Sequence, residues 1–200
     1  MKPQTCILIT GIHHTPAIEL IHQLQEDQNI DWTIHYVGHQ YRSETHLTRS
    51  ISALNIHFHP LVSGKLNRHN HLSNLLSPFL IIKAFFQSLL LLKKIKPDLV
   101  VSFGGYISVP VIIAAKILQI KSITHEQTLT ISMSTKINSY FVDKIALSFP
   151  YNNTVSLPLK KIVITGNLIR REVFNHLNSK YRHLVSPNIP LIYITGGNQG

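Results

Sequence analysis

The sequence is poor in cysteine and in acidic side chains. One cysteine in 200 residues, Cys6, excludes a disulfide framework and a cysteine-rich zinc module, and it fits a reducing compartment. Nine glycines and ten prolines are too few for a collagen-like or low-complexity chain. Because 9 acidic residues face 19 lysines and arginines, the formal net charge is +10. An anionic partner is therefore expected: nucleic acid, lipid headgroups or a phosphorylated substrate.

Long apolar runs are also missing. The apolar run near the N-terminus is too short for a secretory signal. The longest run, residues 79–92, falls short of the roughly 20 residues that span a bilayer, and Lys83 and Gln87 interrupt it. With 44% hydrophobic residues, the chain still has enough apolar material for a sizeable core, so global disorder is excluded.

Short apolar segments alternate with helical patterns. Strands are predicted near residues 6–9, 32–37, 56–60, 99–103, 122–124, 145–149, 162–165 and 191–195. Helices are predicted near residues 16–24, 43–54, 78–96, 108–118, 131–141 and 170–178. Apolar strands that alternate with helices indicate an α/β fold with a parallel sheet covered on both faces.

The last predicted strand is followed by Gly-Gly-Asn-Gln-Gly at residues 196–200. A Rossmann-like unit begins in this way, and a lone strand cannot bury its faces. We therefore expect the sequence to be the front part of a longer architecture. The expected division is a first domain at residues 1–165 and the start of a second at residues 166–200.

Three turns share the layout of apolar strand, glycine turn and helix, at residues 10–14, 104–108 and 196–200. In a parallel sheet such turns lie at the carboxyl ends of the strands, where ligands bind. Glycine permits close backbone approach, and helix N-termini offer N–H donors to phosphate. None of the three is a complete G-x-G-x-x-G or P-loop motif. Together they favour a phosphorylated ligand.

Histidine and glutamate side chains accompany these turns. His13 and His14 lie in the first turn, where either can act as a general base or cap the helix. Glu126 follows a predicted strand, where it either orients a ligand hydroxyl or caps the next helix. The His-x-His pairs at residues 57–59 and 69–71 lack a cysteine or carboxylate partner nearby, so no metal site is predicted.

The predicted helix at residues 78–96 is apolar nearly all round and is flanked by lysines and arginines. It is either deeply buried or a monotopic contact with anionic lipid. A nucleic-acid surface is disfavoured because the basic residues surround aliphatic side chains. The predicted membrane surface consists of Phe79, Leu80, Lys83, Phe85, Phe86, Leu89, Lys93 and Lys94.

Taken in chain order, the motifs resemble those of the MurG family of bacterial glycosyltransferases. The family's K-P-D-V-V-x-x-x-G-G-Y-x-S-x-P is similar to residues 96–110, and its first loop, G-G-T-G-G-H-x-x-P-A, is similar to residues 9–17. H-E-Q-N resembles residues 125–128, and G-N-P-V-R resembles residues 166–170. Shorter likenesses are S-G-L/K at 63–65, A-F-P at 148–150 and G-G-S-Q-G at 196–200.

The resemblance implies a GT-B fold, in which two Rossmann-like domains enclose a cleft. The implied reaction transfers N-acetylglucosamine from UDP-N-acetylglucosamine, with inversion, to a polyprenyl-diphosphate-linked muramyl peptide (lipid I to lipid II). It further implies an N-terminal domain that binds the acceptor and docks peripherally on the anionic cytoplasmic face of the cell membrane. No cofactor, metal or nucleic acid is expected, and the 200-residue chain alone is expected to be inactive.

By the same resemblance, His13 is the expected catalytic base or acceptor-positioning residue. The expected acceptor and phosphate residues are Thr10, Gly11, Gly104, Gly105, Tyr106 and Glu126. The expected donor residues are Thr10, Gly11, Ile12, Thr128, Arg170 and Asn198. Four positions depart from the family's motifs. Ile12 replaces a glycine, and Thr128 replaces an asparagine that contacts the donor side. Leu168 replaces a proline and Asn198 a serine, both in loops.

Two other functions are compatible with the sequence. One is a non-catalytic, acceptor-binding and membrane-anchoring subunit of a split glycosyltransferase. The other is a related GT-B enzyme that glycosylates a different lipid. The coding sequence directly downstream distinguishes these cases, because an in-frame continuation indicates a fragment and a separate reading frame for the donor domain indicates a subunit.

Overall fold

The computed structural model describes residues 2–39, 54–63, 77–151 and 156–173. Residues Met1–Leu168 form one compact unit, and Ile169–Gly200 form a second, of which residues 169–173 are described. The predicted strand at 191–195, the third glycine turn and the pair His69 and His71 lie outside the described residues. So does nearly all of the predicted helix at 43–54. The predicted domain boundary after residue 165 stays a prediction.

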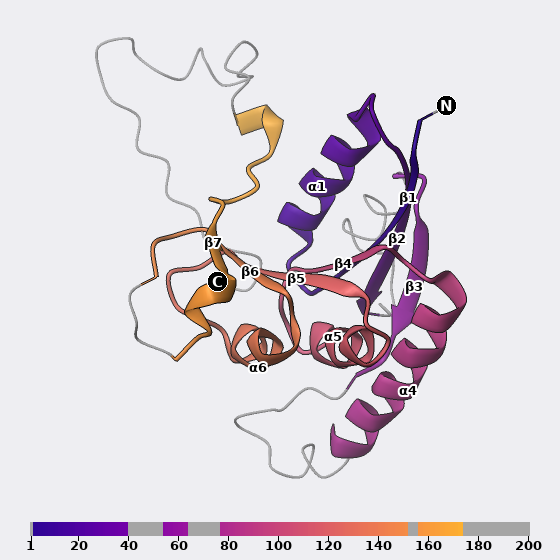
Figure 1. The fold of residues 1–200 in the computed structure, drawn as a ribbon, viewed down its shortest axis with the longest axis vertical. Coiled ribbons are helices and arrows are strands. Elements are labelled where there is room, and N and C mark those ends of the chain that lie inside the picture. The colour runs from indigo at the N-terminus through magenta and orange to yellow at the C-terminus, as the bar shows by residue number, and fades with distance from the viewer. Residues whose placement is uncertain (1, 40–53, 64–76, 152–155, 174–200) are drawn as a thin grey trace, which may run out of the picture. The chain divides into compact units, whose positions relative to one another are not determined.

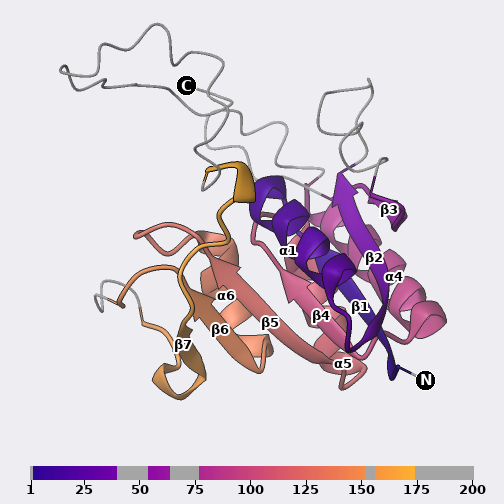
Figure 2. The same ribbon diagram turned by 90° about the horizontal axis from the view of Figure 1, so that it is seen from above.

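A parallel sheet of seven strands forms the centre of the first unit in its described residues (Figures 1 and 2). The strands are β1 (Gln4–Thr10), β2 (Asp31–His39), β3 (His57–Leu61), β4 (Leu99–Ser102), β5 (Lys121–Glu126), β6 (Lys144–Leu147) and β7 (Ile162–Ile164). Their order is β3-β2-β1-β4-β5-β6-β7, and every neighbouring pair is parallel. The first six follow the order of doubly wound nucleotide-binding folds. The predicted α/β fold is confirmed.

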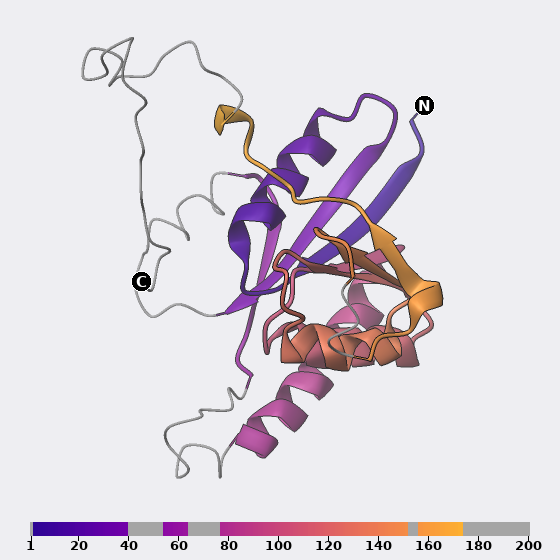
Figure 3. The same ribbon diagram turned by 90° about the vertical axis from the view of Figure 1, so that its left-hand side faces the viewer.

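Helices cover both faces of this sheet. The first is α1 (His14–Glu26), followed by α4 (Ser77–Ile95), α5 (Ser108–Ile117) and α6 (Met133–Phe141). Helix α1 lies on one face, and α4, α5 and α6 lie side by side on the other (Figures 1 and 3). Two short 3₁₀ turns follow, η1 (Leu159–Lys161) and η2 (Arg171–Val173). The described start of the helix predicted at 170–178 is thus a 3₁₀ turn.

Alternation along β1 separates the core into two layers. Ile7 and Ile9 pack with Ala17 and Ile21 of α1, whereas Leu8 faces the other way and joins the cluster beneath α4 and α5. Strands buried on both faces need apolar residues at every position, which explains why they read as short continuous apolar runs.

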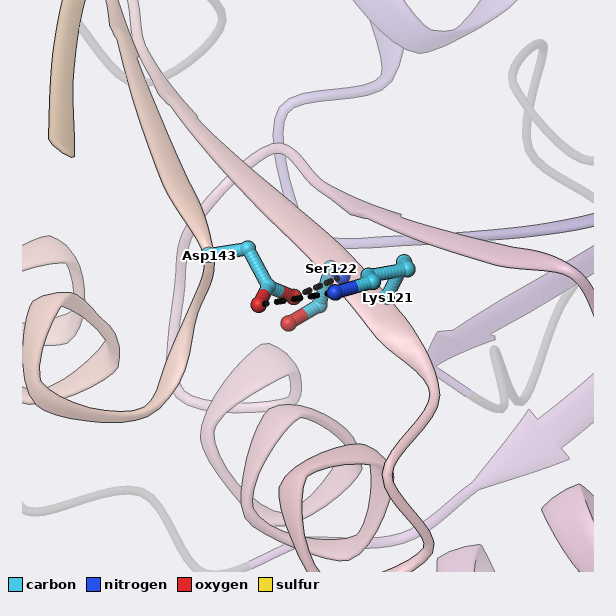
Figure 4. Close-up of polar contacts among 3 residues, drawn as sticks. All are labelled: Lys121, Ser122 and Asp143. Carbon is cyan, nitrogen blue, oxygen red and sulfur yellow. Dashed lines mark hydrogen bonds and ion pairs between the residues drawn. The ribbon is translucent and has the colours of Figure 1, made fainter.

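Aspartates fasten the amino ends of the central strands. Asp98 Oδ2 accepts a hydrogen bond from the Cys6 amide at 2.8 Å, which ties the start of β4 to β1. Asp143 Oδ2 accepts one from the Ser122 amide at 2.9 Å, and its other oxygen lies 3.8 Å from Lys121 Nζ (Figure 4). Because the lysine is exposed, the ion pair contributes at most about 1 kcal/mol. The hydrogen bond from the Ser122 amide to Asp143 is the more specific contact.

A row of buried hydroxyls crosses the carboxyl ends of the strands. Thr10, Ser102 and Thr124 are register partners on β1, β4 and β5, and all three are fully buried. Asn138 of α6 lies over the row, with Nδ2 3.0 Å from Ser108 Oγ, 3.4 Å from Ser102 Oγ and 3.5 Å from Thr124 Oγ1. The amide of Asn138 therefore joins the sheet to the starts of α5 and α6.

Replacing Asn138 with alanine is expected to lower the free energy of unfolding by about 2–3 kcal/mol. The substitution leaves buried hydroxyls without a donor and opens space beneath α6. Chemical denaturation measures the loss. The matched control is Lys136→Ala on the exposed side of the same helix, which should change stability by less than about 0.5 kcal/mol. Equal losses would show that the hydroxyl row carries no special stability.

Candidate functional site

The loops after β1 and β4 meet where the strand order reverses. Strands β1 and β4 are neighbours, but the chain winds from β1 toward β3 on one side and from β4 toward β7 on the other. The Phe103 amide donates to the Thr10 carbonyl at 2.7 Å, and the Ile12 amide donates to the Gly104 carbonyl at 3.2 Å. Such a reversal opens a crevice in which doubly wound folds bind ligands.

Two glycines let these loops approach one another. Gly11 has φ +145°, and a Cβ there would lie 2.8 Å from the carbonyl carbon of Phe103. Gly105 has φ +82°, and a Cβ there would overlap the side chain of Ile12. Ile12 thus packs directly on Gly105, while about a third of the side chain stays exposed. The apolar side chain takes up space above the turn that a glycine in its place would leave open.

Serines hold the backbone amides of the β4–α5 turn. The Gly104 amide donates to Ser102 Oγ at 3.1 Å, and the Gly105 amide donates to Ser134 Oγ at 2.8 Å. Sequence reasoning assigned these two amides to a phosphate and did not identify Ser102 or Ser134. A phosphate contact at either amide would require its serine bond to be exchanged for the ligand.

His13 is the half-buried residue that precedes α1, and its imidazole makes no hydrogen bond as an N-cap. Its Cδ2 lies 3.7 Å from the point that a Cβ on Gly104 would occupy, and Ser134 Oγ lies 3.6 Å from the same point. Burial lowers the pKa of His13, and the Glu126 carboxylate opposes this shift more weakly. The ring is therefore neutral at pH 7 and able to accept a proton.

His14 points into the protein instead. Its side chain is 8% exposed, and Nδ1 lies 2.7 Å from the hydroxyl of Tyr36 on β2. Burial and the neighbouring His13 lower the pKa of His14 to about 4. His13 thus lies at the turn, whereas His14 is packed between α1 and the sheet.

Glu126 is the buried last residue of β5, and its carboxylate organises the loop that follows. Oε1 accepts from the Thr128 amide at 3.3 Å and from Thr128 Oγ1 at 2.9 Å, and Oε2 accepts from the Ser132 amide at 2.9 Å. Burial alone would raise the pKa of Glu126, but these hydrogen bonds outweigh it, so the pKa is lowered. Ser132 Oγ in turn accepts from the Thr135 amide and caps α6.

The other expected site residues are spread more widely. Thr10 lies beneath the loops, and its Oγ1 has no hydrogen-bond partner within the described part of the chain. Tyr106 is half-buried, with its hydroxyl 3.5 Å from His39 Nδ1. Thr128 is exposed beside Glu126. Arg170 belongs to the second unit, and Asn198 lies outside the described residues.

Helix α4 exposes an apolar stripe on the surface. The stripe consists of Phe79, Ile82, Phe86 and Leu90, which are 54–71% exposed. Lys83, Lys93 and Lys94 are exposed as well, and Leu80 is half-buried. Phe85 and Leu89 are only half-buried and also pack against the core, so their place in this surface stays a prediction. The alternative of a fully buried helix is wrong.

The described residues contain no group of three or more histidine, cysteine, aspartate or glutamate side chains arranged to hold a metal ion. No helix among them has both the length and the apolar character needed to cross a bilayer.

The sheet order, the helices on both faces and the glycine turns at the strand reversal define the Rossmann-like N-terminal domain of a GT-B fold. Residues 10–147 match the glycosyltransferase family 28 N-terminal domain, and the chain belongs to that family.

Curated sequences and solved structures both include proteins similar to this chain. The chain is 37% identical over 192 residues to a UDP-N-acetylglucosamine--N-acetylmuramyl-(pentapeptide) pyrophosphoryl-undecaprenol N-acetylglucosamine transferase of Borreliella burgdorferi. It is 35% identical over 195 residues to the protein of the same name in Lachnoclostridium phytofermentans. Each match covers 96% of this chain and 52% of the relative, so the chain spans about half the length of the curated relatives it matches.

Solved structures show the same fold. MurG of Acinetobacter baumannii has a TM-score of 0.64 at 24% identity, over 83% of this chain and 46% of that one. UDP-GlcNAc 2-epimerase of Neisseria meningitidis, bound to UDP-GlcNAc, has a TM-score of 0.58 at 15% identity, over 82% and 46%.

Gly11→Ala is expected to destabilise the unit by more than about 2 kcal/mol, because the new Cβ meets backbone atoms at 2.8–3.0 Å as well as an unfavourable φ. Gly166→Ala is the matched control, since Gly166 also has positive φ (+76°) but no atom within 4 Å of the added Cβ. That variant should lose only about 1 kcal/mol. Thermal unfolding compares the two, and equal losses would show that the close approach of the loops is not what requires glycine at position 11.

Proposed function

We propose that this chain is the acceptor-binding half of an N-acetylglucosaminyltransferase that converts lipid I to lipid II. The observation that carries the proposal is 34–37% identity, over 96% of the chain, to proteins named for that transfer. The geometry supports it, because the loops after β1 and β4 bring a half-buried histidine with a lowered pKa beside a glycine turn. The donor is UDP-N-acetylglucosamine, and the acceptor is the polyprenyl-diphosphate-linked muramyl peptide.

The proposed chemistry is a single displacement at the anomeric carbon of the donor sugar. The 4-hydroxyl oxygen of the acceptor sugar forms the new bond to this carbon as the bond to the UDP oxygen breaks, which inverts the configuration. The hydroxyl proton passes to the neutral imidazole of His13, whose lowered pKa keeps it unprotonated at pH 7. Arg170 is proposed to offset the charge that develops on the departing UDP.

Glu126 is proposed to act through the loop rather than on the substrate. Its two oxygens are already bonded to Thr128 and Ser132, so its effect is to fix the loop and the start of α6, where Ser134 holds the Gly105 amide. Thr128 is exposed on this loop, and its proposed role is to contact the donor. Glu126 is thus a positioning residue in this proposal.

Membrane docking is proposed to use the stripe of α4. Phe79, Ile82, Phe86 and Leu90 present apolar area, and Lys83, Lys93 and Lys94 accompany them on a helix that has no acidic residue. An apolar stripe with basic side chains beside it suits peripheral attachment to an anionic bilayer. The proposed location is the cytoplasmic face of the cell membrane.

His13→Ala is expected to lower kcat by about 10²–10⁴-fold with an unchanged thermal unfolding temperature, because a positioned base contributes this much. The assay uses this chain joined to a donor-binding domain, with UDP-N-acetylglucosamine and a lipid I analogue. His14→Ala is the matched control and should show the larger loss of stability, since only His14 is buried against Tyr36. A near-normal kcat in His13→Ala would contradict the assignment.

The pH profile gives a second check on His13. Because its pKa is lowered from 6.5, the neutral base persists as the pH falls through 6.5. The acid limb of kcat/KM should therefore lie below pH 6.5 and disappear in His13→Ala. An acid limb that is the same in both proteins would assign it to another group.

The double variant Phe79→Ser, Phe86→Ser should weaken binding to phosphatidylglycerol vesicles by at least about tenfold, because two large side chains no longer enter the bilayer. Added salt should weaken binding of the unaltered chain, since headgroup attraction is screened within about 8–10 Å. Vesicle sedimentation measures both effects. Phe149→Ser, at an exposed phenylalanine of another segment, is the control. Equal binding to neutral and anionic vesicles at every salt concentration would contradict the docking proposal.

A further inference from the structure

A groove runs between the edge strand β3 and helix α4. Its volume is about 370 Å³, within the roughly 300–1,000 Å³ range of small-molecule sites. The walls are mostly apolar, with Val37 and Leu61 from the sheet and Leu90 and Leu91 from α4. None of its described lining residues belongs to the loops after β1 and β4, so the groove is distinct from the candidate site there.

Basic side chains occupy polar positions of the groove. His59 of β3 and Lys94 of α4 line it together with the uncharged Gln87, and none of the described lining residues is acidic. His59 belongs to a cluster with His57, two residues earlier on β3, and with His35, the register partner of His57 on β2. His59 Nε2 lies 2.9 Å from His35 Nδ1, and the rings of His35 and His57 stack with centroids 4.7 Å apart.

These contacts make Lys94 the cation of the groove at neutral pH. Burial, His57 and His59 lower the pKa of His35 to about 4, and burial, His57 and Lys94 lower the pKa of His59. The imidazoles of His35 and His59 are therefore neutral at pH 7, and one donates to the other across the 2.9 Å contact. When His35 is the donor, His59 keeps its Nδ1–H for an anionic oxygen. The groove combines apolar walls with one cation and a neutral donor.

The groove is continuous with the exposed stripe of α4. Leu90 belongs to both, being 68% exposed on the stripe and also part of the groove wall. The chemistry that matches both parts is an apolar chain attached to an anionic headgroup.

We propose that the β3–α4 groove binds one anionic phospholipid, with an acyl chain between strand and helix and its phosphate against Lys94 and His59. The proposal deepens the membrane docking proposed for α4 and rests on it. Its consequence is that attachment has a stoichiometric, headgroup-selective component in addition to diffuse attraction by the lysines.

The test uses dihexanoylphosphatidylglycerol below its micelle concentration, so that no bilayer is present. Binding to the 200-residue chain is followed by NMR of the imidazole protons, with dihexanoylphosphatidylcholine as the zwitterionic probe. The expected result is a saturable shift of the His59 signals with phosphatidylglycerol and binding at least about fivefold weaker with phosphatidylcholine. No saturation, or equal affinity for the two lipids, would overturn the proposal.

Two matched pairs of variants locate the site. Lys94→Gln should weaken phosphatidylglycerol binding about fivefold, whereas Lys93→Gln, the same charge change one residue away and outside the groove lining, should weaken it less than about twofold. Gln87→Trp should fill the groove and abolish binding, whereas Phe86→Trp, on the adjacent exposed position, should leave it intact. Circular dichroism checks that each variant is folded. Equal effects within either pair would overturn the groove assignment.

The outcomes separate this proposal from membrane docking itself. Vesicle binding that depends on Phe79 and Phe86, together with no binding of the monomeric lipid, would overturn the groove and leave docking in place. Saturable monomer binding that is weakened about fivefold in Lys94→Gln, in a chain that does not sediment with vesicles, would support the groove and contradict docking.

Discussion

The close approach of two backbone segments, Gly11 against Phe103 and Gly104, is the constraint on which the rest of the candidate site depends. Strands β1 and β4 are neighbours, but the chain continues from them toward opposite edges of the sheet. The turns that directly follow the two strands therefore meet at the point where the strand order reverses. Two backbone hydrogen bonds close the contact, and no side chain fits at position 11. The position of His13 beside Gly104 follows directly, because His13 is two residues beyond the contact.

The sheet and most of its helices could be predicted from the sequence because parallel strands buried on both faces leave a simple signature. Each apolar run ends in a glycine or polar turn, and the described strands fall within a few residues of the predicted ones. The glycine turns and His13 were identified for the same reason, since the carboxyl ends of parallel strands meet at one edge. Because all the strands run parallel, the loops after them share that edge whatever the order of the strands in the sheet.

What the sequence did not reveal depends on contacts between distant residues. The serines that hold the Gly104 and Gly105 amides come from β4 and α6, and Ser134 is 29 positions from Gly105. Helix α4 is apolar on nearly every side, so its pattern could not tell that Phe85 faces the core while Phe86 faces outward. Likewise, His35 joins His57 and His59 only through the register of β2 and β3.

The distribution of acidic side chains explains how a chain with few charges has a strongly basic surface helix. Asp98, Asp143 and Glu126 accept bonds from backbone amides, and Asp27 accepts from the Asn29 amide and the indole of Trp32. These carboxylates stabilise loops and strand ends, and none lies on α4. The lysines of α4 are consequently not neutralised along their own helix, and their charge remains available to an external anion. These carboxylates are thus used in hydrogen bonds within the fold, while the lysines of α4 are left to attract external anions.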